Sequence, residues 1–587
     1  MGNTESKGGG IGGRQTEDLL KLAFEVTQDL FAKLPLDRLK NEIEPEIADQ
    51  FTKFLLDLLN EIEPLLGIKN DILHRSVAEK LSVKARKRKV KTSIMNLGLN
   101  VTEYFDPPVI AVLGSGGGLR AMVAFLGTLS KLAELNLLNL VTYMAGTSGS
   151  TWCMSSLYCY ETWSNNSCLK FMEQNILKTL TSEFPWKTSM ERMKAAFMKE
   201  KHSLTDIWAY VVVYFMTKEL NEEKLSSHKE RCESGNNPYP IYSAVEKKTG
   251  TWFEFTPHAC GFPKHKSFVK TEHLGSKFEE GNLSERHPEP ELCYLRGLWG
   301  SAPANDDIIS GLFKGLKGSF STMSGFNTEG IFSKLTPAVK ETDQDIGEVE
   351  DKELSEEEFY CACRGSGGAT NLCSKVTTEN TEEGKTAAQD TWQDLYVFYR
   401  IMKCLGKWEW GTLNNFLYKC KDDVCPELVN EEEISLVDSG LYINTPYPLM
   451  LPPHRKVDLI LSFDFSAGDP FETLKKTAEY CKENHISFPN VDTKETSEDI
   501  PSQCCYIFEG DGKRTPDVMH FPLFNNQTCE GKVKEMEQKY STFKHAYEES
   551  EVKELLEVSK KNVQESYEKI DMKIKQWVEL RNQRGRP

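Results

Sequence analysis

Two stretches decide the fold: Pro108-Val-Ile-Ala-Val-Leu113, followed by Gly114-Ser-Gly-Gly-Gly118, and Leu140-Val-Thr-Tyr-Met-Ala145, followed by Gly146-Thr-Ser-Gly-Ser150. Each apolar run is short and uninterrupted, as in a strand that is buried on both faces of a sheet. A helical pattern follows each glycine turn. Strand, turn and helix in repeated order predict an α/β fold with a central, mostly parallel sheet.

The chain before these stretches is helical in pattern. Apolar residues recur at helical spacing over residues 16–34, 51–66 and 72–81. We therefore expect a small N-terminal helical region within residues 1–100 and a large α/β domain over residues 101–587.

One segment inside the large domain differs in composition. Between about residues 338 and 390 the chain is rich in Glu, Asp, Thr, Gly and Ser and poor in apolar residues. Such a segment buries too little apolar surface to offset the entropy lost on ordering, so we expect a mobile acidic insertion. Further on, Val457-Asp-Leu-Ile-Leu-Ser-Phe463 predicts another strand, and residues 541–581 have a helical pattern.

Charge and composition argue against several classes of protein. The 587 residues include 71 Lys and Arg against 88 Asp and Glu, and the resulting formal charge of −17 disfavours nucleic acid as a partner. The longest uncharged apolar run, Ile207–Met216, is half of the ~20 residues needed to cross a bilayer. The polar start of the chain lacks the apolar stretch of a secretory signal, so we expect a cytoplasmic protein with reduced cysteines. No Cys-x2-Cys pair repeats at zinc-site spacing, and we expect no metal and no cofactor.

The second glycine turn, Gly146-Thr-Ser148-Gly149-Ser150, contains a candidate nucleophile. A serine between a strand and a helix is exposed at the carboxyl end of a sheet, where a base can take its proton. The glycines let the backbone turn tightly, and the start of the next helix suits developing negative charge. Ser148 is therefore a candidate catalytic residue, although the same pattern also occurs in ordinary turns.

The first glycine turn continues as Gly116-Gly117-Gly118-Leu119-Arg120 and offers oxyanion donors. Backbone N–H groups at a helix start are unblocked and can stabilise an oxyanion that forms in acyl transfer. The turn lacks the Gly-Lys-Ser/Thr ending of a Walker loop. It also matches a loose dinucleotide pattern, but no acidic residue ends the next strand, where a ribose would need one.

Three residues compete for the role of base. His454 and His520 follow the serine in the chain, as the histidine does in the α/β-hydrolase order. Asp438 ends a short apolar strand in Ser435-Leu-Val-Asp-Ser-Gly440. An aspartate in that position also forms ordinary Asx turns, so the pattern alone leaves the choice open.

Taken together, the two glycine turns and Asp438-Ser-Gly440 resemble the patatin-like, cytosolic phospholipase A2 (group IV) family. Four further motifs of that family recur in order: Ser203-Leu-Thr-Asp-Ile-Trp-Ala-Tyr210, Thr251-Trp-Phe-Glu-Phe-Thr-Pro257, Leu295-Arg-Gly-Leu-Trp-Gly-Ser301 and Leu461-Ser-Phe-Asp-Phe-Ser466. Lys407-Trp-Glu-Trp-Gly411 and Gly468-Asp-Pro-Phe-Glu472 are similar to the gamma branch of the family.

The resemblance implies a three-layer catalytic domain with a serine–aspartate dyad. Ser148 would be the nucleophile, Asp438 the group that accepts its proton, and an acyl-serine the intermediate. The backbone N–H groups of Gly116, Gly117 and Gly118 would form the oxyanion hole.

The resemblance also implies the substrate and its phosphate contacts. Arg120 and Arg455 would meet the phosphate, which suits a guanidinium because it presents paired donors. The implied activity is that of a phospholipase A2 and lysophospholipase on membrane glycerophospholipids, with transacylase activity when a lipid alcohol replaces water. A calcium-binding β-sandwich domain at the N-terminus would consist of strands, and the helical pattern there leaves no room for one. We therefore expect an activity that does not depend on calcium.

Two patterns suggest how the chain reaches a membrane. Gly2 with Ser6 fits the myristoylation pattern, and one myristoyl chain needs a second signal for stable anchoring. Lys84-Ala-Arg-Lys-Arg-Lys-Val-Lys91 is a basic run that suits an anionic surface. The chain's last residues, 581–587, contain no cysteine for prenylation. We expect a cytoplasmic enzyme held peripherally at intracellular membranes.

Other interpretations stay open from the sequence. The N-terminus could be unmodified and the basic run simply solvated. The protein could be a catalytically silent, membrane-recruited binding protein, or a Ser–His–Asp esterase that uses His454 or His520.

Overall fold

The computed structural model describes residues 71–102, 105–301, 410–420, 426–542 and 544–584, together with Ser355 and parts of 393–404. The chain divides into two compact units, Met1–His74 and Arg75–Pro587, and every described strand lies in the second. Gly2, the predicted helices at 16–34 and 51–66, and the acidic insertion at 338–390, Ser355 apart, fall outside the described residues.

The central sheet has eleven strands in the order β12-β13-β11-β1-β2-β3-β4-β5-β6, with β10 paired to β3 and to β9. The described strands are β1 (Ile110–Gly114), β2 (Tyr143–Gly146), β3 (Tyr239–Glu246), β4 (Trp252–Phe255), β5 (Ala259–Phe262), β6 (Ser267–Lys270), β7 (Lys277–Glu279), β8 (Asn282–Glu285), β9 (Thr412–Asn414), β10 (Glu433–Val437), β11 (Leu459–Asp464), β12 (Tyr506–Phe508) and β13 (Asp517–Pro522). Strands β13, β11, β1, β2 and β3 run parallel, which confirms the predicted centre of the sheet. The outer strands pair antiparallel.

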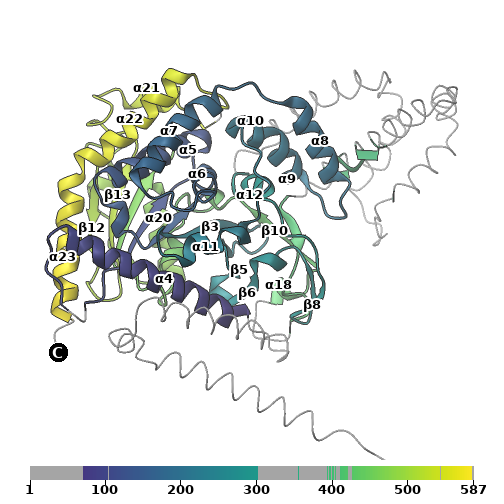
Figure 1. The fold of residues 1–587 in the computed structure, drawn as a ribbon, viewed down its shortest axis with the longest axis horizontal. Helices are drawn as coiled ribbons and strands as arrows, with labels where there is room; N and C mark the ends of the chain where they lie inside the picture. Colours follow the sequence, from purple (N-terminus) through teal and green to yellow (C-terminus); the bar gives the residue numbers. More distant parts are fainter. Residues whose placement is uncertain are drawn as a thin grey trace, which may run out of the picture. The chain divides into compact units, whose positions relative to one another are not determined.

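Helices flank this sheet (Figure 1). The described α-helices are α4 (Asp71–Asn96), α5 (Gly118–Glu134), α6 (Gly149–Leu157), α7 (Asn166–Leu180), α8 (Trp186–Phe197), α9 (Leu204–Ile207), α10 (Tyr214–Thr217), α11 (Lys229–Glu233), α12 (Leu292–Trp299), α18 (Pro426–Val429), α19 (Tyr447–Met450), α20 (Glu472–Glu483), α21 (Val533–Lys539), α22 (Glu549–Glu565) and α23 (Tyr567–Arg584). Helix α5 packs against α6, α7 and α22. Among the described helices, none combines the length and the apolar character needed to cross a membrane.

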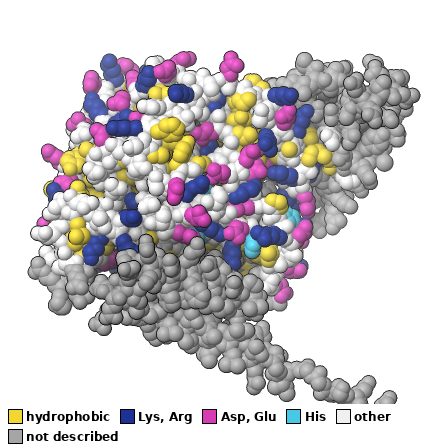
Figure 2. Space-filling view, in the orientation of Figure 1, with side chains coloured by type: hydrophobic (Ala, Val, Ile, Leu, Met, Phe, Trp, Pro, Cys, Tyr) yellow, Lys and Arg dark blue, Asp and Glu magenta, His cyan; other side chains and the backbone are white. Residues whose placement is uncertain are grey.

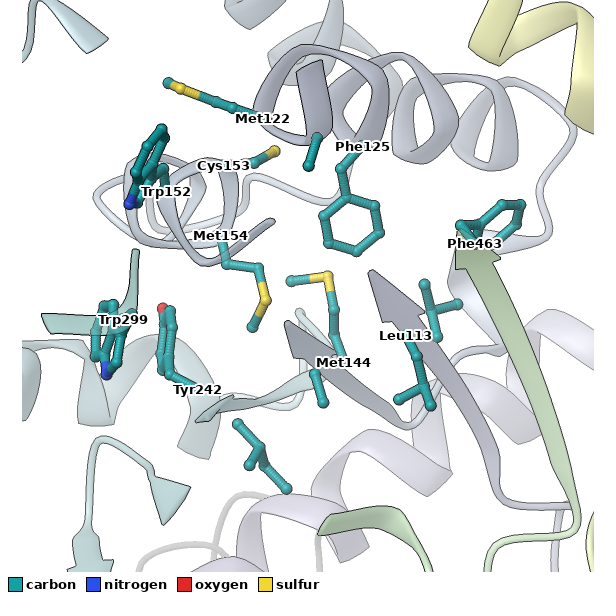
Figure 3. Packing of buried hydrophobic residues seen from close by; sticks show 14 of the residues in the cluster. Leu113, Met122, Phe125, Met144, Trp152, Cys153, Met154, Tyr242, Trp299 and Phe463 are labelled. Carbon is teal, nitrogen blue, oxygen red and sulfur yellow. The ribbon is translucent and has the colours of Figure 1, made fainter. Parts of the chain in front are cut away.

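The core between the central strands and helices α5 and α6 is apolar. Leu113 and Met144 from β1 and β2 lie below Phe125 of α5 and Met154 of α6, and all four side chains are buried (Figure 3). Burying a side chain of this size contributes roughly 1.5–3 kcal/mol, so this layer fixes how the two helices sit on the strands that precede them.

The helix predicted at 72–81 continues to Asn96 as α4, and this places the basic run on a helix. Lys and Arg are good helix formers. Their number makes the apolar stripe of Val90 and Ile94 hard to recognise in the sequence, although both side chains are fully buried. Arg86 turns inward and donates to the carbonyl oxygens of Val141 and Leu138 at 2.7 and 2.8 Å. The basic run is therefore partly structural, because Arg86 supports the fold.

Gly127 of α5 lies at a close contact with α22, and the contact predicts a cost for any side chain there. A Cβ added to Gly127 would lie 2.2 Å from Ser559 Oγ and 2.8 Å from the Leu556 carbonyl oxygen. We expect Gly127→Ala to lower the free energy of unfolding by about 1–3 kcal/mol in urea titrations, despite the better helix propensity of alanine. Adding Ser559→Ala should restore only part of the loss, because the carbonyl remains. A Gly127→Ala protein as stable as wild type would contradict this contact.

Candidate active site

Ser148 lies on the sharp turn between β2, which ends at Gly146, and α6, which begins at Gly149. Its φ of 51° and ψ of −125° are rare for a residue with a side chain, and such strain is typical of functional sites. A Cβ on Gly149 would lie 1.9 Å from the Gly118 carbonyl oxygen, so the two glycine turns touch through their backbones. The predicted strand-to-helix turn is present, with Ser148 at its apex.

The first glycine turn opens α5, but its three glycines are not equivalent. The Gly116 N–H donates to the Asn444 carbonyl oxygen at 3.0 Å, so this predicted oxyanion donor is already engaged. The N–H groups of Gly117 and Gly118 have no hydrogen-bond partner among the described residues. They belong to the first turn of a helix, where N–H groups have no acceptor within the helix. Gly117 and Gly118 are therefore the two donors open to an oxyanion.

Asp438 reaches the same place from β10. Strand β10 pairs antiparallel with the end of β3 through Val437 and Val245, beyond the residue of β3 where its pairing with β2 stops. The Asp438 side chain is fully buried, and its Oδ1 accepts the Gly440 N–H at 2.8 Å. The register thus carries the carboxylate to the edge where β2 turns into α6.

A cluster of three buried hydroxyls joins the two catalytic candidates. Ser439 Oγ lies 2.6 Å from Ser243 Oγ and 3.2 Å from Thr147 Oγ1, and the Ser243 and Thr147 oxygens are 2.9 Å apart. Thr147 precedes Ser148 and Ser439 follows Asp438, so the residues next to the two catalytic candidates are hydrogen-bonded to each other.

Most of the predicted site residues line one pocket. Its volume is about 230 Å³, and it is lined by Gly116, Gly117, Gly118, Arg120, Ser148, Gly440, Asn444, Ser466, Ala467, Glu472, Thr473, Lys476 and Thr542. Sequence reasoning missed Asn444, whose Nδ2 donates to the Gly116 carbonyl and to Ser466 Oγ at 3.2 and 2.6 Å. It also missed Glu472 and Lys476 of α20. Their i, i+4 spacing was visible, but it resembles any exposed helix pair.

Arg120 lies in the pocket wall among uncharged partners. Its guanidinium donates to the carbonyl oxygens of Phe465 and Tyr540 at 2.8 and 2.5 Å, and to Thr542 Oγ1 at 3.3 Å. These partners are uncharged, and they use three of the five N–H groups of an arginine. Burial lowers the pKa of Arg120, the direction expected for a cation taken out of water. Its position and charge suit an anion in the pocket.

Arg455 is different: its contact with the substrate phosphate stays a prediction, and its surroundings favour a structural role. It does not line the pocket, and its side chain is fully buried between Glu79 of α4 and Glu254 of β4. Four hydrogen bonds of 2.9–3.2 Å join it to the two carboxylates, and a fifth goes to the Leu449 carbonyl oxygen. Burial alone would lower the pKa of Arg455, but the charges of Glu254 and Glu79 outweigh it and raise that pKa. No donor remains for a phosphate.

The two histidines that competed for the role of base lie outside the pocket lining, as does Asp438, but Asp438 is hydrogen-bonded to Gly440 of that lining. His520 is fully buried on β13, where its Nε2 lies 2.7 Å from the Pro470 carbonyl oxygen and donates to it. His454 is exposed to solvent. Among the described residues that line the pocket, none is a histidine.

A group of metal-ligand types lies elsewhere in the domain. Atoms of Cys159, Glu223 and His228 lie within 4.8 Å of one another. Arg231 Nη1, however, donates to Glu223 Oε2 at 3.1 Å, and His228 Nε2 is 3.2 Å from the same oxygen. Because the only carboxylate of the group is already paired with an arginine, we assign no metal to it.

Comparison with known proteins agrees with this geometry. Residues 110–389 match the family model described as the lysophospholipase catalytic domain. Cytosolic phospholipase A2 gamma from Homo sapiens is 39% identical over 520 residues, which cover 84% of this chain and 93% of that protein. The Mus musculus gamma protein is 37% identical over 570 residues, 87% of this chain and 92% of that protein. The solved structure of human GIVD cytosolic phospholipase A2 has a similar fold, with a TM-score of 0.62 at 24% identity over 86% of this chain and 67% of that one.

The chain is therefore an enzyme of phospholipid hydrolysis that carries a lysophospholipase catalytic domain. It belongs to the cytosolic phospholipase A2 family, and its similarity to the gamma forms extends over most of its length. The resemblance drawn from the sequence motifs is confirmed.

The environment of Arg455 predicts a structural role that can be measured. Arg455→Met leaves two buried carboxylates without a counter-charge, and we expect the free energy of unfolding to fall by about 3–5 kcal/mol in denaturant titrations. Lys475→Met serves as the control, because it removes a half-exposed pair with Asp469 and should cost less than about 1 kcal/mol. An Arg455→Met protein of wild-type stability with weaker substrate binding would restore Arg455 as a phosphate ligand.

Proposed function

We propose that the chain is a calcium-independent phospholipase A2 and lysophospholipase that hydrolyses acyl esters of membrane glycerophospholipids through a dyad of Ser148 and Asp438. One observation carries the proposal: strained Ser148, two glycine N–H groups without partners and Arg120 converge on one pocket. A nucleophile, oxyanion donors and a phosphate partner are the groups that the hydrolysis of a phospholipid ester requires.

Acylation would begin with attack of Ser148 Oγ on the ester carbonyl carbon, while Asp438 accepts the hydroxyl proton. The Gly117 and Gly118 N–H groups stabilise the oxyanion, because fixed dipoles at a helix start need no reorganisation during the reaction. When the tetrahedral intermediate collapses, the glyceryl oxygen leaves and takes the proton from Asp438. The acyl group stays on Ser148 as an ester.

Deacylation repeats these steps with a new nucleophile. Asp438 takes a proton from water as the water oxygen attacks the acyl-serine carbonyl, and the proton passes to Ser148 Oγ when the fatty acid leaves. A lipid hydroxyl in place of water would give a new lipid ester. The same intermediate therefore supports the proposed transacylase activity.

Calcium has no evident place in this site. Glu472 is the only carboxylate among the described residues that line the pocket, whereas Ca²⁺ usually takes about six to eight oxygen ligands. The cations that would meet the phosphate are side chains, Arg120 foremost. These observations support activity in the presence of a chelator.

Ser148→Ala should abolish both turnover and covalent labelling. A solved relative, human GIVD cytosolic phospholipase A2, is named in complex with methyl gamma-linolenyl fluorophosphonate. We expect wild-type protein to gain one adduct of this reagent by intact mass and Ser148→Ala to gain none, because the activated serine oxygen attacks phosphorus. Fatty-acid release from phospholipid vesicles in chelator should fall at least about 10³-fold in Ser148→Ala and in Asp438→Ala.

Three outcomes would redirect the proposal. Activity lost in His454→Ala or His520→Ala but kept in Asp438→Asn would favour the Ser–His–Asp esterase. A wild-type protein that binds vesicles and releases no fatty acid from any lipid tested would favour the binding protein. Activity that disappears in chelator would exclude calcium independence.

We further propose that the enzyme works at a membrane surface, held there by an aromatic cluster of Phe184, Trp186, Tyr214 and Phe215. Phe184 lies within 4.8–5.3 Å of the other three rings, and Trp186 at the start of α8 is 56% exposed. Lys218 Nζ lies 4.0 Å from the Phe215 ring centre. Aromatic rings beside lysines are typical of residues at a membrane interface.

Charge and position support a lipid surface as the partner of this cluster. Residues 166–201, which include α7 and α8, carry seven Lys and Arg against four Glu in a chain that is strongly acidic overall. Figure 2 shows hydrophobic side chains and Lys or Arg side by side on this part of the surface. A Cβ on Gly118 would lie 3.7 Å from Met216 Cε, so α10, which also carries Phe215, borders the pocket. Gly2 stays a proposed myristoylation site. The basic run of residues 84–91, apart from Arg86, is the proposed second signal for membrane anchoring.

Trp186→Ala should weaken membrane binding without changing the chemistry. We expect its partition coefficient on vesicles of phosphatidylcholine with anionic phosphatidylserine to fall about tenfold in a sedimentation assay, because a half-exposed indole no longer enters the interface. Hydrolysis of a short-chain lysophospholipid below its critical micelle concentration should not change. Met572→Ala, which removes a 60% exposed side chain from α23, is the matched control. Equal loss of binding in both variants would contradict a local docking surface.

A further inference from the structure

The pocket contains a second cation beside Arg120, and it is Lys476 of α20. Lys476 Nζ pairs with Glu472 Oε1 at 2.8 Å, and both side chains line the pocket. With Arg455 fully occupied by two buried glutamates, Lys476 is the only other cation among the described lining residues. The pocket lining therefore offers a positive and a negative group side by side, besides Arg120.

A neighbouring ion pair, between Lys475 of α20 and Asp469 just before that helix, shows what distinguishes this one. Lys475 and Asp469 also lie 2.8 Å apart, with side chains 44% and 43% exposed, against 44% and 56% for Lys476 and Glu472. The two pairs thus match in distance and are similar in exposure, and Lys475 and Lys476 are neighbours on α20, but neither Lys475 nor Asp469 lines the pocket. Position in the pocket is the difference between them.

We propose that Arg120, Lys476 and Glu472 form a headgroup subsite for phospholipids whose headgroup is zwitterionic. This inference rests on the proposed function, since it names the substrate class of the same site. The phosphate binds between the Arg120 guanidinium and Lys476 Nζ, and the ammonium of a choline or ethanolamine binds the Glu472 carboxylate. Exchanging one half-exposed ion pair for two such contacts loses little, because an exposed pair contributes little on its own.

Three substrates with the same acyl chain separate the roles of the two side chains. Lysophosphatidylcholine has a phosphate and an ammonium, lysophosphatidic acid has the phosphate alone, and monoacylglycerol has neither. We expect Glu472→Gln to lower kcat/KM on lysophosphatidylcholine about tenfold, mainly through KM, and to leave lysophosphatidic acid unchanged or improved. Lys476→Met should lower kcat/KM about tenfold on both phosphate-bearing substrates and leave monoacylglycerol unchanged.

The control and the contrary outcomes are well defined. Lys475→Met should leave all three values of kcat/KM unchanged, because its matched ion pair lies outside the pocket. Equal effects of Glu472→Gln on all three substrates would overturn the subsite, and so would unchanged ratios in both variants. A wild-type enzyme that hydrolyses none of the three substrates would instead overturn the proposed function. If wild type hydrolyses all three and the variants keep the same ratios of kcat/KM between substrates, only the subsite is overturned.

Discussion

The carbonyl oxygen of Gly118 occupies the space where a side chain on Gly149 would have to lie, and this backbone contact shapes the whole site. Two further bonds hold the turns together: Thr147 N–H donates to the Gly114 carbonyl at 3.1 Å, and Ser150 Oγ donates to the Ser115 carbonyl at 2.6 Å. Neighbouring parallel strands are needed for this contact, because only they deliver two turns to the same edge of a sheet. The proposed nucleophile and oxyanion donors are thus positioned by the close backbone contact and these two hydrogen bonds.

The two arginines show how the same side chain serves opposite purposes. Arg120 is buried with uncharged hydrogen-bond partners, so its charge is left to be neutralised by an anion in the pocket. Arg455 is buried between two carboxylates, Glu79 of α4 and Glu254 of β4, and its ion pairs link these two elements. Moving a charge from water into the protein interior is costly unless a partner compensates it. The partners of a buried arginine therefore decide whether it can bind a ligand or supports the fold.

The sequence predicted what depends on local pattern and missed what depends on distant partners. Continuous apolar runs and glycine turns located β1, β2 and the turns that hold Ser148, because these features are written in a few adjacent residues. The antiparallel outer strands were not predicted, since pairing in a sheet is set by residues far apart in the chain. The partners of Arg455 were not predicted, because Glu79 lies 376 positions away. The acceptor of the Gly116 N–H was not predicted either, because it is the backbone carbonyl of Asn444, which no sequence pattern reveals.

The distribution of charge bears on the proposed membrane binding. A chain with a formal charge of −17 repels an anionic surface at long range, yet salt screens such fields beyond about 8–10 Å. Within that distance the local groups decide: the surplus of Lys and Arg around α7 and α8, the exposed Trp186, and the pocket cations Arg120 and Lys476. Apolar contact is insensitive to net charge, so the proposed docking through the aromatic cluster does not depend on the acidic charge of the chain. In that proposal, Arg120 and Lys476 act only on a phosphate that has already reached the pocket.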